Sequence, residues 1–250
     1  LNPGTYERFK DFEDFRAEFR LGNLGMSYEE LREKVVVQRN VSYKKYETGK
    51  LRPDGMPGFN TPTGRVELYS TMFRQFGVDP LPFYEEPQLS PVSTPEKMEE
   101  YPFVLTTGAR TYCYFHSEGK QIPYLREINP DPLIEINPED ALKLGIADGQ
   151  WVRVSNPFGS CVLKAKVTQT VYPGLVMAQH GFWFPEKDPE EPSLYEVWRS
   201  NINELIPHFM VGKLGFGAPF KCLICSVKPV SENYDTDMME VWDHFGKLVI

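Results

Sequence analysis

The sequence predicts a mainly β protein built around a compact β-barrel, with a few short helices and a partly helical N-terminal extension. Nineteen glycines and 22 prolines among 250 residues favour many turns and short strands over a helix bundle. Short apolar runs separated by turn signals recur from residue 103 to about residue 230. A hydrophobic fraction of 41% and a charged fraction of 25% exclude wholesale disorder.

The N-terminal zone, residues 1–77, is charged and carries helical patches. Aromatic residues recur every three or four positions across residues 6–20, which predicts one face of an amphipathic helix. Ser27 and Glu30 form the pattern of a capping box that opens a second helix through residue 34. The following segments are expected to be a loop at 50–63, a strand at 64–70 and a helical turn at 71–76.

Residues 78–102 are predicted to be an extended connector. This stretch holds six prolines and several glutamates. A pair of carboxylates could serve acid–base catalysis, but no apolar surroundings accompany these, so solvated linker charges are the favoured interpretation.

The third zone, residues 103–230, carries the strands of the predicted barrel, and residues 231–250 are taken as a C-terminal extension. Asn137 as N-cap, Pro138 at the first helical position and Gly145 just beyond the end predict a short helix. A second short helix is expected to begin at a proline and span 123–127. The expected strands cover 103–107, 133–136, 151–155, 161–167, 175–178 and 222–228.

The loop after the first of these strands, residues 107–122, is the main candidate site. It carries cationic and polar side chains, namely Arg110, His116, Ser117, Lys120 and Gln121. Backbone N–H groups with Arg and Lys make an anion cradle for a phosphate or a polar heterocycle. An ordinary polar surface loop is the alternative that composition alone leaves open.

Two further segments offer recognition groups. Asn201 and Asn203 place two amides beside apolar anchors, which suits the donors and acceptors of a heterocycle, although an ordinary turn explains them equally. The string HGFWFPE at 180–186 could wall a flat ring or pack the end of the barrel, and Lys221 follows the ring of Phe220.

Two other chemistries are weaker candidates. Adjacent His116 and Ser117 point to opposite sides of an extended chain, so they do not form a nucleophile pair. Cys222 and Cys225 have the spacing of zinc ligands and could join Cys113 and His116, which leaves a small zinc-bound β domain open. Cys161 shares the parity of apolar strand residues and is assigned to the core.

Several strings taken together resemble a known module. These strings are LTTGAR, INPEDALKLGIADGQWVRVSNPFGS, KAKVTQTVYPGLV, HGFWFPE, NINELIP and KCLICSVKP. Their order resembles the C-terminal molybdopterin-dinucleotide-binding domain of the dimethyl sulfoxide reductase family of molybdenum or tungsten oxidoreductases. The resemblance covers roughly residues 59–230, and HGFWFPE is most similar to the branch with acetylene hydratase, polysulfide or thiosulfate reductases and aryl dehydroxylases.

The resemblance implies a double-psi β-barrel, as in formate dehydrogenase and aspartate decarboxylase, that caps two pyranopterin guanine dinucleotides. It implies that Thr107, Gly108 and Arg110 contact the cofactor from a strand-end loop. It implies that His116 and Ser117 reach the pterin and phosphate region. It also implies that Asn203 is the pterin-side amide and that Lys221 is the lysine before the last strand. Ile206 stands where the family commonly has Thr, which removes a hydroxyl from the Asn203 motif.

The resemblance also implies partners. The chain shows no cysteine cluster for a 4Fe–4S centre and no stretch that supplies the metal's own ligand. Both belong to upstream catalytic domains in this family, so we expect an excised piece or subunit that is inactive alone. An Fe–S electron-transfer subunit is a further expected partner, and the compartment, cytoplasmic or periplasmic in a prokaryote, stays open.

Charge and hydropathy exclude other classes. A net charge of −8 without a Lys/Arg cluster argues against general nucleic-acid binding, and no apolar run is long enough to span a bilayer. The rival function is a double-psi barrel acting as a protein-interaction or substrate-recognition module through the 107–122 loop. Substrate, reaction direction and the choice between molybdenum and tungsten are not encoded in these motifs.

Overall fold

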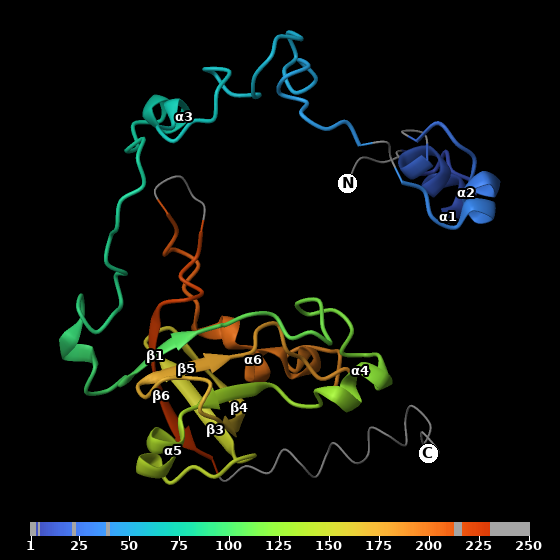
Figure 1. Ribbon diagram of the computed structural model, residues 1–250. Helices are drawn as coiled ribbons and strands as arrows, with labels where there is room; N and C mark the ends of the chain where they lie inside the picture. The colour runs from blue at the N-terminus through green and yellow to red at the C-terminus, as the bar shows by residue number, and fades with distance from the viewer. Residues whose placement is uncertain (1–3, 5, 22–23, 39–40, 213–216, 231–250) are drawn as a thin grey trace. The chain divides into compact units, whose positions relative to one another are not determined.

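The structure is a computed structural model that describes residues 4, 6–21, 24–38, 41–212 and 217–230 (Figure 1). The predicted extension at 231–250 lies outside the described residues. The chain divides into two compact units, Leu1–Phe76 and Gly77–Ile250. The division into tail, connector and barrel remains a prediction. Within the described residues, no helix combines the length and apolar character needed to cross a membrane.

The first unit contains short helices and turns. Its helices are α1 at Phe12–Arg16, a π-helical turn at Ala17–Leu21, α2 at Tyr28–Lys34 and α3 at Thr71–Gln75. The capping box of α2 is confirmed, because Glu30 N donates to Ser27 Oγ at 3.1 Å and Ser27 N donates to Glu30 Oε2 at 2.7 Å.

Two expectations for this unit are wrong. The helix expected from residue 6 begins only at Phe12, because the Asp11 carboxylate caps it by accepting from Asp14 N at 2.9 Å. The segment 64–70 forms bends instead of a strand. The Glu67 carboxylate accepts hydrogen bonds from Thr63 and Thr71 on either side, which turns the backbone locally.

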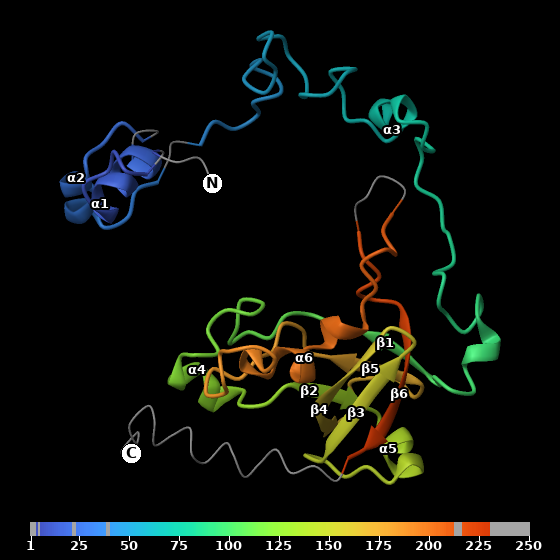
Figure 2. The ribbon, with the colours of Figure 1, turned by 180° about the vertical axis from the view of Figure 1, so that it is seen from behind.

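The second unit holds a closed barrel of six strands (Figure 2). The strands are β1 at Phe103–Thr106, β2 at Leu133–Ile136, β3 at Trp151–Asn156, β4 at Gly159–Val167, β5 at Leu175–Ala178 and β6 at Leu223–Pro229. Their spatial order is β1-β5-β2-β4-β3-β6. The β1–β5 and β2–β4 pairs are parallel, and the remaining pairs are antiparallel. The predicted mainly β fold class is confirmed, and the pairing agrees with a double-psi barrel.

Inward-facing side chains fill the barrel. Ile134, Val152, Leu163 and Ile224 are fully buried, and each stabilises the fold by about 1.5–3 kcal/mol through removal of apolar surface from water. Cys161 is buried in the same cluster, as its strand parity predicts. The rigid core fixes where each strand ends, and therefore where the loops begin.

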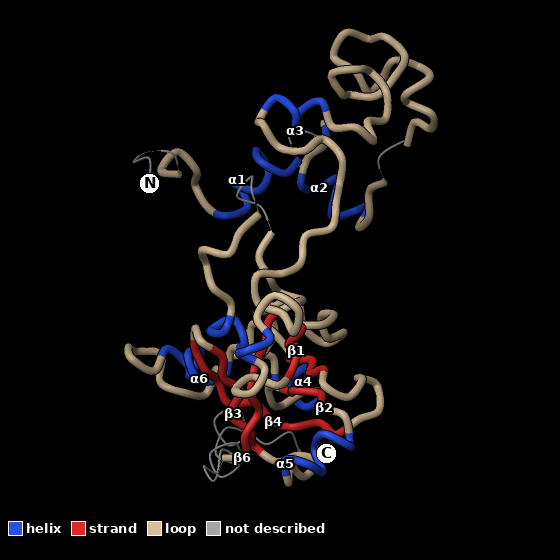
Figure 3. The backbone as a smooth tube through the Cα atoms, turned by 90° about the vertical axis from the view of Figure 1, so that its left-hand side faces the viewer, coloured by secondary structure: helices blue, strands red, loops and turns tan. Residues whose placement is uncertain are grey.

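Short helices surround the barrel (Figure 3). They are α4 at Pro123–Ile128, α5 at Pro138–Leu144, α6 at Val197–Ser200 and 3-10 turns at Pro95–Lys97, Leu194–Glu196 and Ile202–Leu205. The predicted caps of α5 are confirmed: Glu139 N donates to Asn137 Oδ1 at 3.0 Å, and Gly145 has a φ of 65°. Figures 1 and 2 show α4 and α5 on different sides of the barrel.

Candidate functional site

The barrel brings three distant segments to one end. Strands β1 and β5 are parallel, so the loops that follow residues 106 and 178 leave at the same end. Strand β6 is antiparallel to β1, so the residues that precede it lie there too. Thr107 N donates to Phe220 O at 2.9 Å, which joins the first and last of these segments. We call this end the barrel mouth, formed by residues 107–120, 179–181 and 220–222.

Lys221 is held against the end of β1. Its Nζ donates to Gly108 O and lies 3.5 Å from the buried Thr107 Oγ1. Gly108 has a φ of 59°, and a Cβ there would lie 2.2 Å from Met177 Sδ. Glycine therefore suits both the positive φ and the limited space at this position. Thr107, Gly108 and Lys221, which the sequence nominated separately, are brought together.

Two imidazoles meet at the mouth. His116 Nδ1 lies 2.9 Å from His180 Nε2, and the two residues are 64 positions apart in the chain. His116 has a φ of 55°, a left-handed conformation that is uncommon for a residue with a side chain. Burial lowers the pKa of His180, the neighbouring His116 lowers it further, and a backbone contact with Thr107 acts in the opposite direction.

Lys120 lies beneath this pair and is only 1% exposed. Its Nζ donates to His116 O at 2.8 Å and lies 4.2 Å from the ring centroid of Tyr114. Burial lowers the pKa of Lys120 to about 8. Sequence reasoning placed Lys120 in the candidate anion cradle but not among the cofactor contacts that the resemblance implies. The flanking aromatic residue Tyr114 was the only local signal that it would be covered.

A cavity connects these groups. Its lining is cationic and aromatic, and it comprises Ala109, Arg110, Thr111, Tyr114, His116, Lys120, Gln179, His180 and Phe182. No Asp or Glu is among these described lining residues. The Arg110 guanidinium lies over the Phe115 ring, 4.3 Å from its centroid. The cavity therefore presents positive charge without a carboxylate to neutralise it, which favours an anion.

The predicted residues Ser117 and Asn203 join the mouth through backbone contacts. Trp183 Nε1 donates to Ser117 O at 2.7 Å. Asn201 Oδ1 accepts from Gly181 N and from Asn203 N, each at 3.1 Å. Asn201 thus fixes the turn, while the exposed side chain of Asn203 is left available. All seven predicted site residues therefore belong to one connected region of loops.

The residues of the HGFWFPE string have two roles, which are packing and the positioning of neighbouring backbone. Phe182 and Phe184 are buried in a second apolar cluster with Cys113, Tyr114, Trp151 and Val162. Trp183 holds the Ser117 backbone, as described above. Packing is therefore the role of the two phenylalanines, while His180 and the edge of Phe182 line the cavity.

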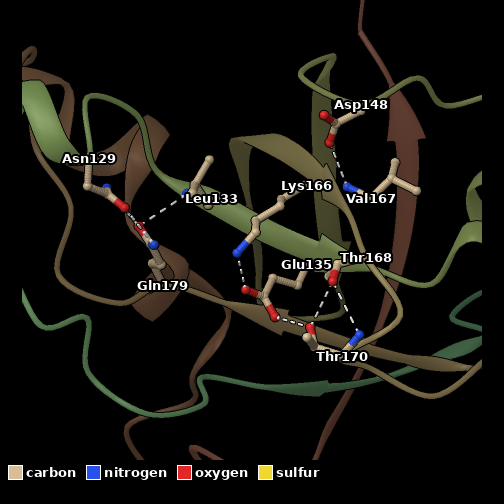
Figure 4. Close-up of polar contacts among 9 residues, drawn as sticks. All are labelled: Asn129, Leu133, Glu135, Asp148, Lys166, Val167, Thr168, Thr170 and Gln179. Carbon is tan, nitrogen blue, oxygen red and sulfur yellow. Dashed lines mark hydrogen bonds and ion pairs between the residues drawn. The ribbon is translucent and has the colours of Figure 1, made fainter.

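A second hollow of about 480 Å³ adjoins the first and shares Arg110, Thr111 and Gln179 with it. Asn129 and Gln179 exchange two amide hydrogen bonds of 3.1 and 2.9 Å on its wall (Figure 4). Lys166 Nζ donates to Glu135 Oε1 at 2.9 Å nearby. Sequence analysis missed this wall, because its residues come from β2, β4 and the segments that follow α4 and β5, and they meet only in the closed barrel.

The zinc alternative finds no support. Cys225 is buried in β6, where burial raises its thiol pKa, and Cys222 is partly exposed. Within the part of the chain that the structure describes, no three His, Cys, Asp or Glu side chains are grouped so that they could hold a metal ion.

The donor set of the mouth fits a diphosphate-bearing ligand. Arg110, Lys120 and Lys221 supply charged N–H donors, and the His116–His180 pair supplies ring nitrogens. Charge-assisted hydrogen bonds of this kind are about twice as strong as neutral ones. The exposed amide of Asn203 suits the edge of a heterocycle.

Comparison with known proteins agrees with this chemistry. A model of the molydopterin dinucleotide binding domain matches residues 103–215. Acetylene hydratase of Syntrophotalea acetylenica is 35% identical over 170 residues, which are 68% of this chain and 22% of that protein. Dopamine dehydroxylase of Eggerthella lenta is 34% identical over 191 residues, covering 67% of this chain and 18% of that protein. The chain thus spans about a fifth of the length of these relatives.

A solved structure is also similar. Acetylene hydratase from Pelobacter acetylenicus superimposes with a TM-score of 0.74 at 27% identity, covering 89% of this chain and 30% of that one. The dimethyl sulfoxide reductase DmsA of Escherichia coli is 29% identical over 180 residues, 66% of this chain and 21% of that protein. Residues 103–215 are therefore a molybdopterin dinucleotide-binding domain of the dimethyl sulfoxide reductase family.

Proposed function

We propose that the barrel mouth holds the diphosphate and pterin portions of molybdopterin guanine dinucleotide within a larger molybdenum or tungsten oxidoreductase. The observation that carries this proposal is the grouping of Arg110, His116, Lys120 and His180 around a pocket that is itself too small for the ligand and has no acidic residue in its described lining. The family match supports the cofactor class. What we propose is the role of each individual residue in holding the cofactor.

Each group has a distinct role. Lys221 and Arg110 contact the diphosphate, and the Gly108 backbone between them in space lets the ligand come close. His116 and Ser117 contact the region between phosphate and pterin. Asn203 presents its amide to the pterin edge from a turn that Asn201 holds in place. When bound, the cofactor supplies a dithiolene-held metal, and this chain's residues orient it and exclude water.

We propose further that upstream catalytic domains complete the enzyme. The relatives are about five times longer than the segment matched here. Those domains would supply the metal ligand and the Fe–S relay, and an Fe–S electron-transfer subunit would deliver electrons. The whole chain of 250 residues is accordingly expected to be inactive alone with reduced viologen and a substrate.

Binding of a guanine diphosphate ester tests the site. GDP-mannose carries the guanosine and a diphosphate diester, so it presents the dinucleotide end without the metal. Calorimetry on the full chain should detect binding, and Arg110→Ala and Lys221→Ala should each weaken it about tenfold or more. Lys228→Ala, an exposed lysine near the other end of β6, is the matched control and should bind as the parent does. Equal affinity in all four proteins would overturn the proposed role of the mouth.

A further inference from the structure

The His116–His180 contact differs from the other groups at the mouth in the number of protons that it can accept. A hydrogen bond between two imidazoles needs one nitrogen that carries a proton and one that carries a lone pair. The neutral pair satisfies this condition at 2.9 Å. One added proton leaves the hydrogen bond intact on an imidazolium–imidazole pair. A second added proton would set N–H against N–H, so the pair accepts one proton only.

The groups around the pair disfavour the addition of even this one proton. His180 is subject to the like charges of His116, Lys221 and Lys120, with burial acting in the same direction, and the backbone contact with Thr107 opposes them. Arg110 lines the same cavity, and the phenol of Tyr114 adds no negative charge near neutral pH because burial raises its pKa to about 12. The exposed Glu118 forms an isolated backbone bridge with Phe115 and is absent from the lining of this cavity.

A bound anion reverses this balance. A diphosphate diester brings negative charge against Arg110, Lys120 and the pair, and an opposite charge within about 4–6 Å favours the protonated form of an imidazole. By linkage, a ligand that binds the protonated form more tightly must also draw a proton from solvent when it binds.

We propose that the His116–His180 pair is the proton-accepting part of the anion site, so that a diphosphate ligand binds together with one proton and binds more tightly as the pH falls. The inference rests on the proposed function and extends it, because it assigns the pair a role in charge matching that simple donor residues do not have. Proton and ligand enter together and leave together, while the hydrogen bond between the rings is kept.

Two isosteric variants separate this role from a structural one. His180→Gln replaces Nε2 by an amide nitrogen at the same reach, and His116→Asn does the same for Nδ1. Asparagine also tolerates the left-handed backbone at residue 116, so this variant should fold. Neither amide accepts a proton in the neutral range, so both variants keep a polar contact and lose the titration.

The experiment uses the full chain and GDP-mannose, whose diphosphate diester keeps a constant charge across the neutral range. Ring signals of the histidines are followed by NMR against pH with and without this probe, and His208, which packs against Phe209, serves as the reference imidazole. The pair should titrate about one unit higher with the probe bound, and affinity should rise about three- to fivefold between about pH 8 and pH 6. Calorimetry in buffers of different ionisation enthalpy should show proton uptake.

The outcomes are distinguishable. Both isosteric variants should lack the gain in affinity at about pH 6 relative to their own affinity at about pH 8. If the parent binds GDP-mannose with no proton uptake, or if the variants retain the pH dependence, the inference is wrong and the proposed function stands. If the parent does not bind GDP-mannose at any pH tested, both fall.

Discussion

Arg126 and Glu186 form a buried ion pair that ties α4 to the segment after β5. Arg126 NH2 lies 2.9 Å from Glu186 Oε1, and the two side chains are 7% and 5% exposed. The guanidinium also lies near the rings of Phe182 and Phe184, so charge and aromatic packing converge there. This contact supports the wall of the barrel mouth from behind, because α4 follows directly on the 107–122 loop.

The first prediction concerns this pair. Arg126→Met should lower the free energy of unfolding by about 3–5 kcal/mol, because it leaves the Glu186 carboxylate buried without its partner. Adding Glu186→Gln to this variant should restore a large part of the loss. Urea denaturation followed by tryptophan fluorescence measures both values.

The control for this prediction is Lys143, whose ion pair with Asp140 involves a lysine side chain that is largely exposed. Lys143→Met should change the free energy of unfolding by less than about 1 kcal/mol. An Arg126→Met protein as stable as the parent would contradict the account of the buried pair.

The second prediction concerns the close approach of β4 to the Ile202–Leu205 turn. A Cβ at Gly159 would lie 2.4 Å from the backbone oxygen of Glu204, and backbone cannot move aside as a side chain can. Gly159→Ala should therefore cost about 1–3 kcal/mol of stability and displace the turn that carries Asn203. The neighbouring Ser160 is exposed and already carries a Cβ, so Ser160→Ala should lie within about 0.5 kcal/mol of the parent.

Thermal denaturation compares the two variants. The amide signal of Asn203 in an NMR spectrum should shift in Gly159→Ala and stay in place in Ser160→Ala. An unchanged spectrum in both would mean that β4 does not set the position of this turn.

The third prediction concerns Lys120 and alkaline pH. Its pKa falls from 10.5 to about 8 on folding, so between these values the unfolded chain binds more protons than the folded one. The contribution of Lys120 to the free energy of unfolding therefore rises with pH across that window. Below the window, the charged lysine destabilises the folded state. Lys120→Met should be most favourable relative to the parent below about pH 8 and lose about 2–3 kcal/mol of that advantage by about pH 10.5.

The difference between the urea-unfolding curves of Lys120→Met and the parent, measured at several pH values, checks this slope. Lys166 offers the matched control, because its side chain is 50% exposed on β4. Lys166→Met should change the free energy of unfolding by less than about 1 kcal/mol. A flat difference for Lys120→Met would mean that its ammonium is not desolvated.

The fourth prediction concerns the four cysteines, which are free thiols. Cys113, Cys161 and Cys225 are buried, and Cys222 is partly exposed. Iodoacetamide should therefore label Cys222 first in the native chain, while the three buried thiols react only on unfolding. Cys222→Ser should remove the fast phase. Rapid labelling of two or more thiols in the folded protein would contradict the burial described here.

The barrel was largely predictable because its signals are local. Asn137, Pro138 and Gly145 specify α5 by capping chemistry alone, and turn pairs separate the strands that the structure contains. The strand expected at 64–70 failed because the pattern of alternation carries no information on the hydrogen bonds of the Glu67 carboxylate. Local alternation predicts a strand only where a partner strand exists.

The site was predictable in its parts and not in its pairing. Residues with cofactor chemistry were found from loop composition and family resemblance. The His116–His180 contact depends on the parallel pairing of β1 and β5, which sequence patterns leave unspecified. The burial of Lys120 depends on the rings of Tyr114 and Phe182, which are far apart in the chain and converge only after the barrel closes.

The position of β6 between β1 and β3 has a consequence for biosynthesis. The first strand of the barrel leaves the ribosome more than a hundred residues before the strand that completes it. Lys221 emerges with that last strand, so a nascent chain lacks one rim of the mouth until translation has passed the whole domain. A ligand that needs Lys221 can therefore be held at the mouth only after β6 has joined β1 and β3.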